Sequence, residues 1–156
     1  SIDIELDLVG PIHDKQFEKK VKRKISLHKD YVKWEGPIPY GQIIKKITNY
    51  DVGYAALHDH PNYRWSLPTK LLEYNAAGLI AIASDLPITR DYVKQGINGL
   101  IVKPNDTNEI IIALEKIWSG GFYKNRKNIR NFIISSFSWQ SERTKLIAVY
   151  NKVIKS

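Results

Sequence analysis

The sequence of 156 residues contains no cysteine and no methionine. Without cysteine the chain can form no disulfide and offers no thiolate for catalysis or metal binding. No apolar run approaches the length of a membrane span, and no basic start precedes an apolar region, so neither a span nor a signal peptide is expected. The motifs G-x-S-x-G, G-x-x-x-x-G-K-[ST] and G-x-G-x-x-G are also missing, which removes three common catalytic and phosphate-binding signatures.

Positive charge is in excess, with 24 Lys and Arg against 16 Asp and Glu and a net charge of +8. It is concentrated in HDKQFEKKVKRKISLHKD (13–30) and in a second group of Lys124, Arg126, Lys127 and Arg130. Such charge attracts nucleic acid, anionic lipid or phosphorylated substrates, or it belongs to solvated helix faces. A nucleic-acid module needs stacking aromatics or a reading helix as well, and Phe17 is expected in the core, so no nucleic-acid partner is predicted.

An anionic membrane surface is the better candidate partner for the first group. The contact residues would be Lys19, Lys20, Lys22, Arg23 and Lys24.

The hydrophobic pattern predicts strands that alternate with helices. Strands are expected near 2–9, 31–36, 52–57, 79–84 and 99–102. Helices are expected near 14–28, 42–49, 67–78, 86–95, 106–120, 123–135 and 139–154. This order predicts an α/β fold, a Rossmann-like parallel sheet of about five strands with helices on both faces.

Local signals refine four of these helices and one strand. In the first, Phe17, Val21 and Ile25 are spaced four apart and form one apolar stripe. Ser66 is expected to cap the helix of 67–78, with Pro68 in its first turn. Asp106 and Glu109 form a capping box at the start of the helix of 106–120, and Ser138 is expected to cap the last helix. The opening strand, IDIELDLV, has one polar face.

A ligand of an open parallel sheet binds beyond the carboxyl ends of the strands. There the long loop 57–66 enters the helix that carries Thr69, Lys70 and Glu73 on one face. Thr69 and Lys70 lie in the first turn, where free N–H groups and the helix dipole favour an anion. Glu73, one turn deeper, can accept hydrogen bonds from the two hydroxyls of a ribose. A phosphate site beside a site for two neighbouring hydroxyls indicates nucleotide binding. The alternative is an ordinary salt bridge between Lys70 and Glu73 on a solvated helix face.

Two neighbouring features of the loop 57–66 also have a binding interpretation and a simpler structural one. His58, Asp59 and His60 could face one ion, but no third and fourth ligand is evident, so no metal site is predicted. Trp65 could stack on a base or sugar, or could pack over the start of the helix.

The segment LPTKLLEYNAAGLIAIASD (67–85), followed by YVKQGINGLIVKPND (92–106), resembles the C-terminal half of a GT-B glycosyltransferase. The group it is most similar to is the family-four class of nucleotide-sugar-dependent enzymes. LVG, the glycine-proline loop after a short strand, YDVGYAAL and FSW (137–139) also fall where that family has them. The similarity covers about residues 4–150.

The resemblance implies roles for residues at the donor. Glu73 would contact the ribose, and the backbone of Ser66–Thr69 would meet the diphosphate and sugar beside Lys70. The GPIPYG loop (36–41) would hold the base through main chain near Ile38 and Pro39.

One departure concerns the donor sugar. The family's first glutamate lies eight residues before Glu73, where this chain has Trp65. A subgroup with the pattern P-x-K-x-x-E-Y lacks it too, and Pro68, Lys70, Glu73 and Tyr74 match that pattern.

The resemblance also implies a function. Residues 1–156 are expected to form a single donor-binding domain, a fragment that lacks the N-terminal acceptor domain and the first strand–helix unit. The whole protein would be a hexosyltransferase that moves a sugar from a nucleoside-diphosphate sugar to an acceptor hydroxyl, in polysaccharide or glycolipid biosynthesis. Its acceptor, a glycan or lipid-linked glycan, would bind to the missing domain.

No cofactor and no catalytic residue is predicted in this chain, which we expect to be inactive alone. The expected location is the cytoplasm, with the membrane surface as a peripheral site. The alternative is a non-catalytic nucleotide- or partner-binding module of the same fold.

Overall fold

The computed structural model describes residues 3–154. The chain divides into two compact units, Ser1–Lys46 and Ile47–Ser156. Within the described residues, five short strands form a two-stranded and a three-stranded sheet, and every strand pair is parallel. The α/β class with about five parallel strands is therefore confirmed, although the strands are divided between two sheets. Ile2, at the start of the expected first strand, lies outside the described residues.

The first unit is a strand–helix–strand motif. β1 (Leu6–Leu8) pairs with β2 (Val32–Trp34), and α1 (Lys15–Leu27) connects them. The parallel register places Leu6 opposite Val32 and Leu8 opposite Trp34. α2 (Tyr40–Ile47) then leads out of this unit.

Burial on α1 differs from the prediction at one position. Val21 and Ile25 are half-buried, but Phe17 is 57% exposed, so its assignment to the core is wrong. The spacing explains this. Residues four apart advance by about 40° around a helix, so Phe17 lies about 80° from Ile25 and turns away from the side that packs.

The sequence also predicted one polar face for the first strand. In the folded unit Leu6 and Leu8 are exposed, whereas Asp7 is half-buried, with a carboxylate oxygen 3.7 Å from the Lys46 ammonium. No residue between 3 and 46 is fully buried. The buried hydrophobic core of the described chain therefore lies in the second unit.

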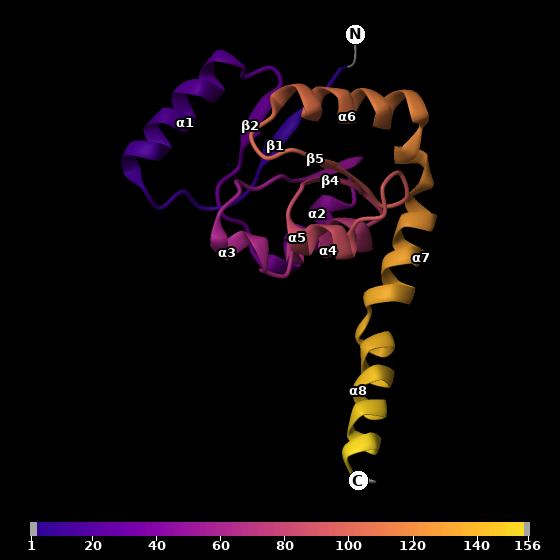
Figure 1. Ribbon diagram of the computed structural model, residues 1–156. Coiled ribbons are helices and arrows are strands. Elements are labelled where there is room, and N and C mark those ends of the chain that lie inside the picture. The colour runs from indigo at the N-terminus through magenta and orange to yellow at the C-terminus, as the bar shows by residue number, and fades with distance from the viewer. Residues whose placement is uncertain (1–2, 155–156) are drawn as a thin grey trace. The chain divides into compact units, whose positions relative to one another are not determined.

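The second unit is built on the sheet β3-β4-β5 (Figure 1). Its strands are β3 (Val52–Ala55), β4 (Ile80–Ser84) and β5 (Gly99–Val102). Its helices are α3 (Pro61–Arg64), α4 (Thr69–Ala76), α5 (Pro87–Tyr92), α6 (Thr107–Gly120), α7 (Arg126–Phe137) and α8 (Trp139–Ile154), with a 3-10 turn, η1 (Phe122–Asn125), before α7.

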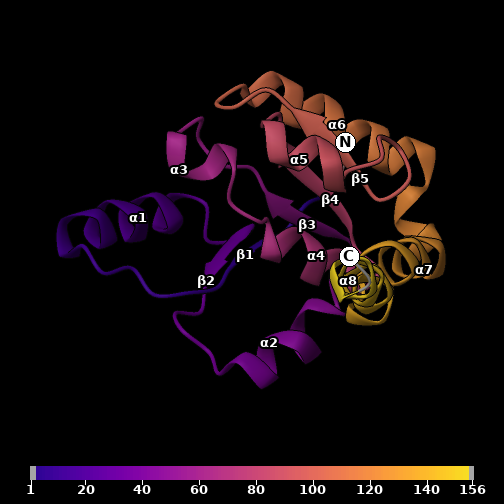
Figure 2. The same cartoon turned by 60° about the horizontal axis from the view of Figure 1, so that its bottom comes forward.

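Helices cover both faces of this sheet, as the two views in Figures 1 and 2 show. Residues of β4 and β5 that point to one face pack against α6 and α7 in a buried cluster of Ile80, Ile82, Leu100, Val102, Ala113, Ile117 and Ile129. The opposite face packs against α4 and α5 in a second cluster of Leu71, Ala81, Ala83 and Val93. β4 is buried along its whole length, which explains its continuous apolar sequence.

The helix ends test the predicted caps. Asp106 caps α6 as expected, since its carboxylate accepts the Glu109 N–H at 3.1 Å. The capping box is only half formed, because the Glu109 carboxylate accepts the Lys103 N–H at 2.6 Å instead. Ser138 also caps as predicted, through its hydroxyl and the Ser141 N–H at 3.3 Å.

Two arginines of α7 hold the C-terminal end of α4. Arg130 donates to the Ala76 carbonyl at 2.8 Å. Arg126 donates to the carbonyls of Tyr50 at 2.6 Å and Thr48 at 2.7 Å, and reaches Ala77 at 3.4 Å. The last carbonyls of a helix lack partners within the helix and attract cations. These two members of the second basic group therefore have structural partners.

A buried pair of amides joins α4 to the rest of the second unit. Asn75 and Asn98 are both 0% exposed, and the Asn98 amide donates to the Asn75 side-chain oxygen at 2.9 Å. The Asn75 amide donates to the carbonyls of Leu79 (2.9 Å) and Asn98 (2.8 Å). Asn98 also donates to the Tyr92 carbonyl and accepts the Lys94 N–H. The pair thus connects α4, the start of β4 and the segment between α5 and β5.

α8 is covered least. It continues from α7 away from the sheet of its unit (Figure 1), and none of its residues is buried. Large apolar residues exposed along it are Trp139, Leu146, Ile147, Val149, Tyr150, Val153 and Ile154. Between residues 3 and 154, no helix combines the length and hydrophobicity needed to cross a bilayer.

The buried amide pair predicts a specific stability defect. Asn98→Ala leaves the Asn75 side-chain oxygen and the Lys94 N–H without their partners, and a buried unsatisfied group costs about 1–3 kcal/mol. We expect the free energy of unfolding in urea to fall by about that amount. Asn128→Ala, at an exposed position of α7, is the matched control and should change it by less than about 0.5 kcal/mol. Equal stability of the two variants would contradict the role of the pair.

Candidate functional site

The carboxyl ends of β3, β4 and β5 meet at one edge of their parallel sheet, where ligands bind in such folds. The loops at this edge are hydrogen-bonded to one another. The Ser84 hydroxyl, at the end of β4, donates to the Leu57 carbonyl at 2.5 Å and accepts the Leu57 N–H at 2.7 Å. The Asp85 N–H donates to the Val102 carbonyl at 2.8 Å. The long loop after β3 therefore leaves the sheet from a fixed point.

His58 and Asn105 face each other across this edge. His58 Nδ1 is hydrogen-bonded to the side-chain oxygen of Asn105 in the turn after β5. Asn105 is the one non-glycine residue of the described chain with a left-handed backbone (φ 63°), a conformation that asparagine tolerates better than most residues. His58 stands out in the sequence, whereas Asn105 does not; the signal for Asn105 is its place in the turn KPND.

The three side chains of the HDH sequence have separate partners. His58 bonds Asn105, and the Asp59 carboxylate binds Arg64 through two hydrogen bonds of 2.6 and 2.8 Å. These bonds hold the pKa of Asp59 below its ordinary value. His60 caps α3 by accepting the Asn62 N–H at 3.3 Å. No group of three or more potential ligands occurs in the described part of the chain.

This loop contains α3, a short helix that the sequence analysis did not predict. α3 lies beside α5 (Figure 2). Pro61 at its first position suits a helix start, and His60 supplies the cap. Its presence corrects the role of Ser66, whose hydroxyl donates to the Asn62 carbonyl and does not cap α4.

The start of α4 keeps backbone donors available. Pro68 occupies the N-cap position without a side-chain hydrogen bond, and Thr69 N–H donates to the Leu67 carbonyl at 2.9 Å. The N–H groups of Lys70 and Leu71 have no acceptor among residues 3–154. Two free N–H groups at the positive end of the helix dipole, with a lysine beside them, make a site suited to an anion.

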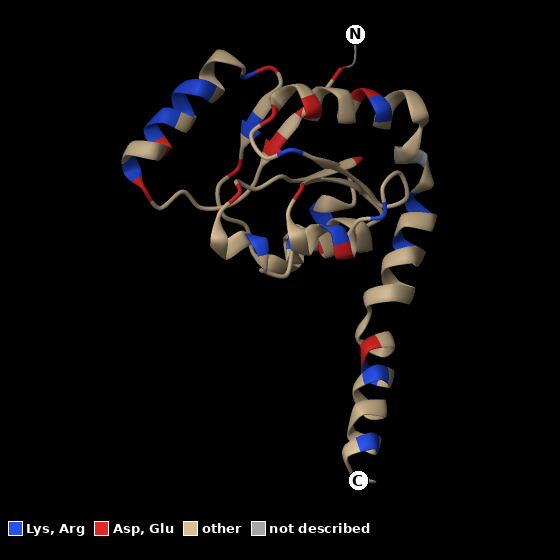
Figure 3. Ribbon diagram, viewed as in Figure 1, with Lys and Arg blue, Asp and Glu red and all other residues tan. Residues whose placement is uncertain are grey.

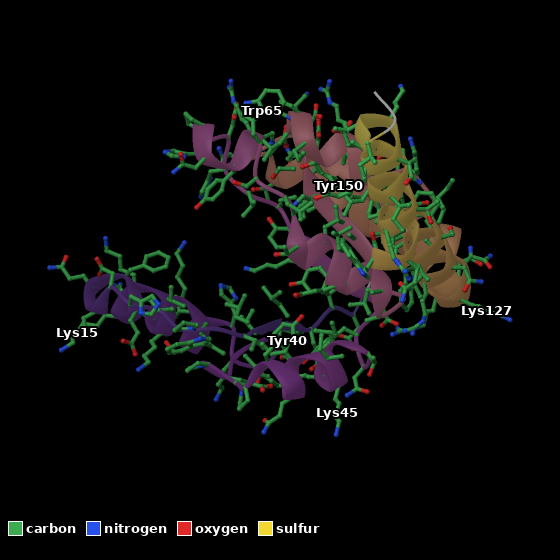
Figure 4. The ribbon with its side chains drawn as sticks, turned by 90° about the horizontal axis from the view of Figure 1, so that it is seen from below. Lys15, Tyr40, Lys45, Trp65, Lys127 and Tyr150 are labelled. Carbon is green, nitrogen blue, oxygen red and sulfur yellow. The ribbon has the colours of Figure 1, made fainter. Side chains whose placement is uncertain are left out.

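The predicted contact residues around α4 lie at the surface. Thr69 and Lys70 are exposed, and Glu73 is half-buried on the same side of the helix, one turn on. Trp65 is 74% exposed, and its side chain stands away from the ribbon in Figure 4. The interpretation that Trp65 packs over the helix start is therefore wrong.

Tyr74 and Gly53 fix the height of α4 above the sheet. A Cβ at Gly53 would lie 2.3 Å from two ring carbons of Tyr74, so the ring rests directly on the backbone of β3. Burial, and then the charge of the neighbouring Glu73, raise the pKa of Tyr74. The glycine in YDVGYAAL thus has a packing role next to the candidate site.

The two remaining predicted residues belong to the first unit. Ile38 is half-buried and Pro39 exposed, in the loop before α2. The Pro39 carbonyl accepts the N–H groups of Gln42 at 2.9 Å and Ile43 at 3.2 Å. Both lone pairs of the Pro39 carbonyl are therefore engaged within the chain.

The comparisons place this geometry in a family. The model of the glycosyl transferases group 1 family matches residues 1–134. The chain therefore belongs to that family, and its fold matches the C-terminal, Rossmann-like half of GT-B glycosyltransferases. No curated protein matches the chain directly by sequence.

Solved structures share the fold. A glycosyltransferase from Rickettsia africae is 20% identical with a TM-score of 0.79, covering 99% of this chain and 41% of that one. HepE from Anabaena, in complex with UDP, is 15% identical with a TM-score of 0.74, covering 96% and 41%. The C-terminal domain of LpcC from Francisella tularensis is 17% identical with a TM-score of 0.68 and covers 87% of both chains. The chain thus spans about two-fifths of the longer relatives.

The contact between Gly53 and Tyr74 predicts an effect on stability. Gly53→Ala places a methyl carbon 2.3 Å from two ring carbons of Tyr74, and overpacking of this kind costs about 1–3 kcal/mol. Chemical denaturation should show a loss of that size. The control is Gly41→Ala in α2, where a Cβ meets nothing within 4 Å and the change should stabilise by up to about 1 kcal/mol. A Gly53→Ala variant as stable as the parent would exclude the close contact.

Proposed function

We propose that this chain binds a nucleoside-diphosphate sugar and forms the donor half of a glycosyltransferase. The observation that carries the proposal is the start of α4. Free N–H groups of Lys70 and Leu71, the Lys70 ammonium and the Glu73 carboxylate occupy one side of a single helix at the ligand-binding edge of the sheet. This combination suits a phosphate next to a ribose.

Each group has a distinct task in this proposal. The helix start and Lys70 bind the diphosphate and stabilise the negative charge that grows on it as the sugar leaves. Glu73 accepts hydrogen bonds from the ribose hydroxyls. Trp65, exposed beside the helix, stacks on the base or the sugar, and Ser66 and Thr69 line the phosphates. Ile38 offers main-chain contacts for the base, with Pro39 beside it.

Structures of relatives support the donor class. HepE from Anabaena has been solved with UDP, with UDP and glucose, and with UDP-glucose. These ligands are those of a protein that shares the fold at low identity, so we extend only the class, a nucleoside-diphosphate hexose, to this chain. In the proposed reaction the sugar passes to an acceptor hydroxyl, as the sequence motifs of the family-four class imply.

The rest of the enzyme lies outside this chain in the proposal. The longer relatives are more than twice its length, and the exposed apolar residues of α8 are suited to contact with another part of such a protein. An acceptor domain and a first strand–helix unit would complete the fold. The acceptor would be a glycan or a lipid-linked glycan, and the whole enzyme would serve polysaccharide or glycolipid biosynthesis in the cytoplasm, at the membrane surface.

The second candidate function is a non-catalytic nucleotide- or partner-binding module of the same fold. Trp65 favours it, because it replaces the glutamate that contacts the donor sugar in the family. The two functions differ in one measurement. If the polypeptide extended upstream of Ser1 binds a nucleoside diphosphate but transfers no sugar, the module is correct.

Nucleotide binding should depend on Glu73. We expect one of UDP, GDP or ADP to bind selectively in calorimetric titration, and Glu73→Ala to weaken that binding about tenfold to a hundredfold, since a hydrogen bond to a charged group contributes about 1.5–3 kcal/mol. Glu115→Ala, at an exposed position of α6, is the control and should bind like the parent. Unchanged affinity in the Glu73 variant, or no selectivity among the three, would refute the assignment.

The chain alone should not transfer sugar. Transfer requires an acceptor held against the donor in a closed cleft, and this chain is proposed to supply only one side. A turnover assay with radiolabelled donor sugars should therefore give product no faster than buffer does, while the nucleotide still binds. Product formed by the isolated chain would overturn this division of labour.

A further inference from the structure

One face of α1 combines exposed apolar and cationic side chains. Phe17, Lys20, Lys24 and Leu27 follow the i, i+3, i+7, i+10 spacing and fall within about 80° of one another around the helix axis. Phe17 is 57% exposed and Leu27 is 73% exposed. The proposed donor site uses none of these four residues. We call them the α1 face.

The neighbouring side of the helix is the one that packs. Val21 and Ile25 are half-buried there. Lys22 forms an ion pair with Glu18 at 2.6 Å, and its ammonium lies 5.4 Å from the centre of the Trp34 ring. Lys22 therefore has partners within the first unit. Lys20 and Lys24, by contrast, form no ion pair with any residue between 3 and 154.

Most charged residues of α1 are basic. Its 13 residues include six Lys or Arg and one Glu. Figure 3 shows the basic positions recurring along the helix, and Figure 4 shows Lys15, at its start, extending away from the ribbon. A surface of this kind is complementary to a polyanion.

The apolar members of the face decide which polyanion fits. A nucleic-acid surface uses cations with aromatic platforms on which bases stack, and Leu27 cannot serve as one. A helix that lies in a membrane interface carries Lys and Arg on its polar face, and Phe or Leu on the face that meets the acyl chains. On α1, Phe17 and Leu27 lie at the two edges of the face and Lys20 and Lys24 between them. A bilayer surface suits both kinds of group, because long lysine side chains keep their charged ends among the phosphates while their stems and the apolar residues meet the acyl boundary.

We propose that the α1 face binds the surface of an anionic phospholipid bilayer. Phe17 and Leu27 insert at the boundary between headgroups and acyl chains, and Lys20 and Lys24 contact the lipid phosphates. The helix lies in the plane of the membrane. This inference goes beyond donor binding, because it concerns a helix and a ligand that the donor site does not involve.

The test is sedimentation of the full chain with vesicles of phosphatidylcholine, with and without phosphatidylserine. We expect binding only to the anionic vesicles, and release as salt rises, because surface charges are screened. Each lysine near such a surface contributes enough that removing two weakens partitioning about thirtyfold. Lys20→Glu with Lys24→Glu should therefore lose binding by at least about that factor.

Apolar insertion has its own variant. Phe17→Ser with Leu27→Ser keeps every charge of the helix and should still weaken binding at least about tenfold, since buried apolar area adds to electrostatic attraction. If charge alone holds the chain to the vesicles, this variant binds like the parent, and the inserted helix is disproved. Both positions are exposed, so the variants should keep the parent circular dichroism spectrum.

Matched controls separate the α1 face from overall charge and hydrophobicity. Lys116→Glu with Lys127→Glu makes the same charge change at exposed positions of α6 and α7. Val149→Ser with Ile154→Ser removes two exposed apolar side chains from α8. Both control variants should bind vesicles like the parent. Loss of binding in either control as large as in the α1 variants would overturn the assignment to α1.

Two further outcomes are informative. Displacement from vesicles by single-stranded RNA, with RNA binding that survives Phe17→Ser and Leu27→Ser, would identify a nucleic-acid face and contradict the proposal. Nucleoside-diphosphate binding should be unchanged in all α1 variants. A failure of membrane binding is therefore distinct from a failure of the donor site, which Glu73→Ala tests.

Discussion

The buried hydrogen bonds between Asn75 and Asn98 are the interaction on which the second unit depends most. The sheet is enclosed mainly by apolar contacts, which give stability without fixing one arrangement. The two amides are fully satisfied only when α4, the start of β4 and the segment before β5 occupy one relative position. Buried polar pairs are costly when partly satisfied, so alternative packings of α4 are disfavoured. The candidate site lies at the other end of that helix.

The position of α4 is fixed from three directions, and this matters because the helix is short. Its C-terminal carbonyls bind Arg126 and Arg130, its buried side holds Asn75, and Tyr74 rests on the backbone at Gly53. A helix of eight residues is about 12 Å long, so a small tilt at one end would displace its first turn by ångströms. Rigid support at the C-terminal end therefore keeps the free N–H groups of the first turn in place for an anion.

The sequence could predict whatever depends on local pattern. The apolar run of β4 and the Asp106 cap follow from periodicity and capping chemistry, and the structure has both. It could not predict that Ser66 bonds Asn62 within an unforeseen helix, or that Trp65 stays exposed, because those outcomes depend on how one loop folds back on itself. The Pro39 carbonyl is engaged for another reason, because α2 begins at Tyr40, two residues before the predicted helix. Residue types indicated a site on α4, but only the folded structure reveals which backbone donors are free.

The exposure of Phe17 has a further consequence for α1. Lys20 and Lys24 are four residues apart, as are Lys15 and Lys19, and Lys19 and Arg23. Like charges at this spacing destabilise a helix by a few tenths of a kcal/mol per pair, and only Glu18 offsets them within the helix. In water α1 thus bears both cationic repulsion and exposed apolar surface. An anionic bilayer relieves both at once, because its phosphates neutralise the lysines and its acyl boundary accepts Phe17 and Leu27. Neither neutral lipid nor a simple counter-ion does so.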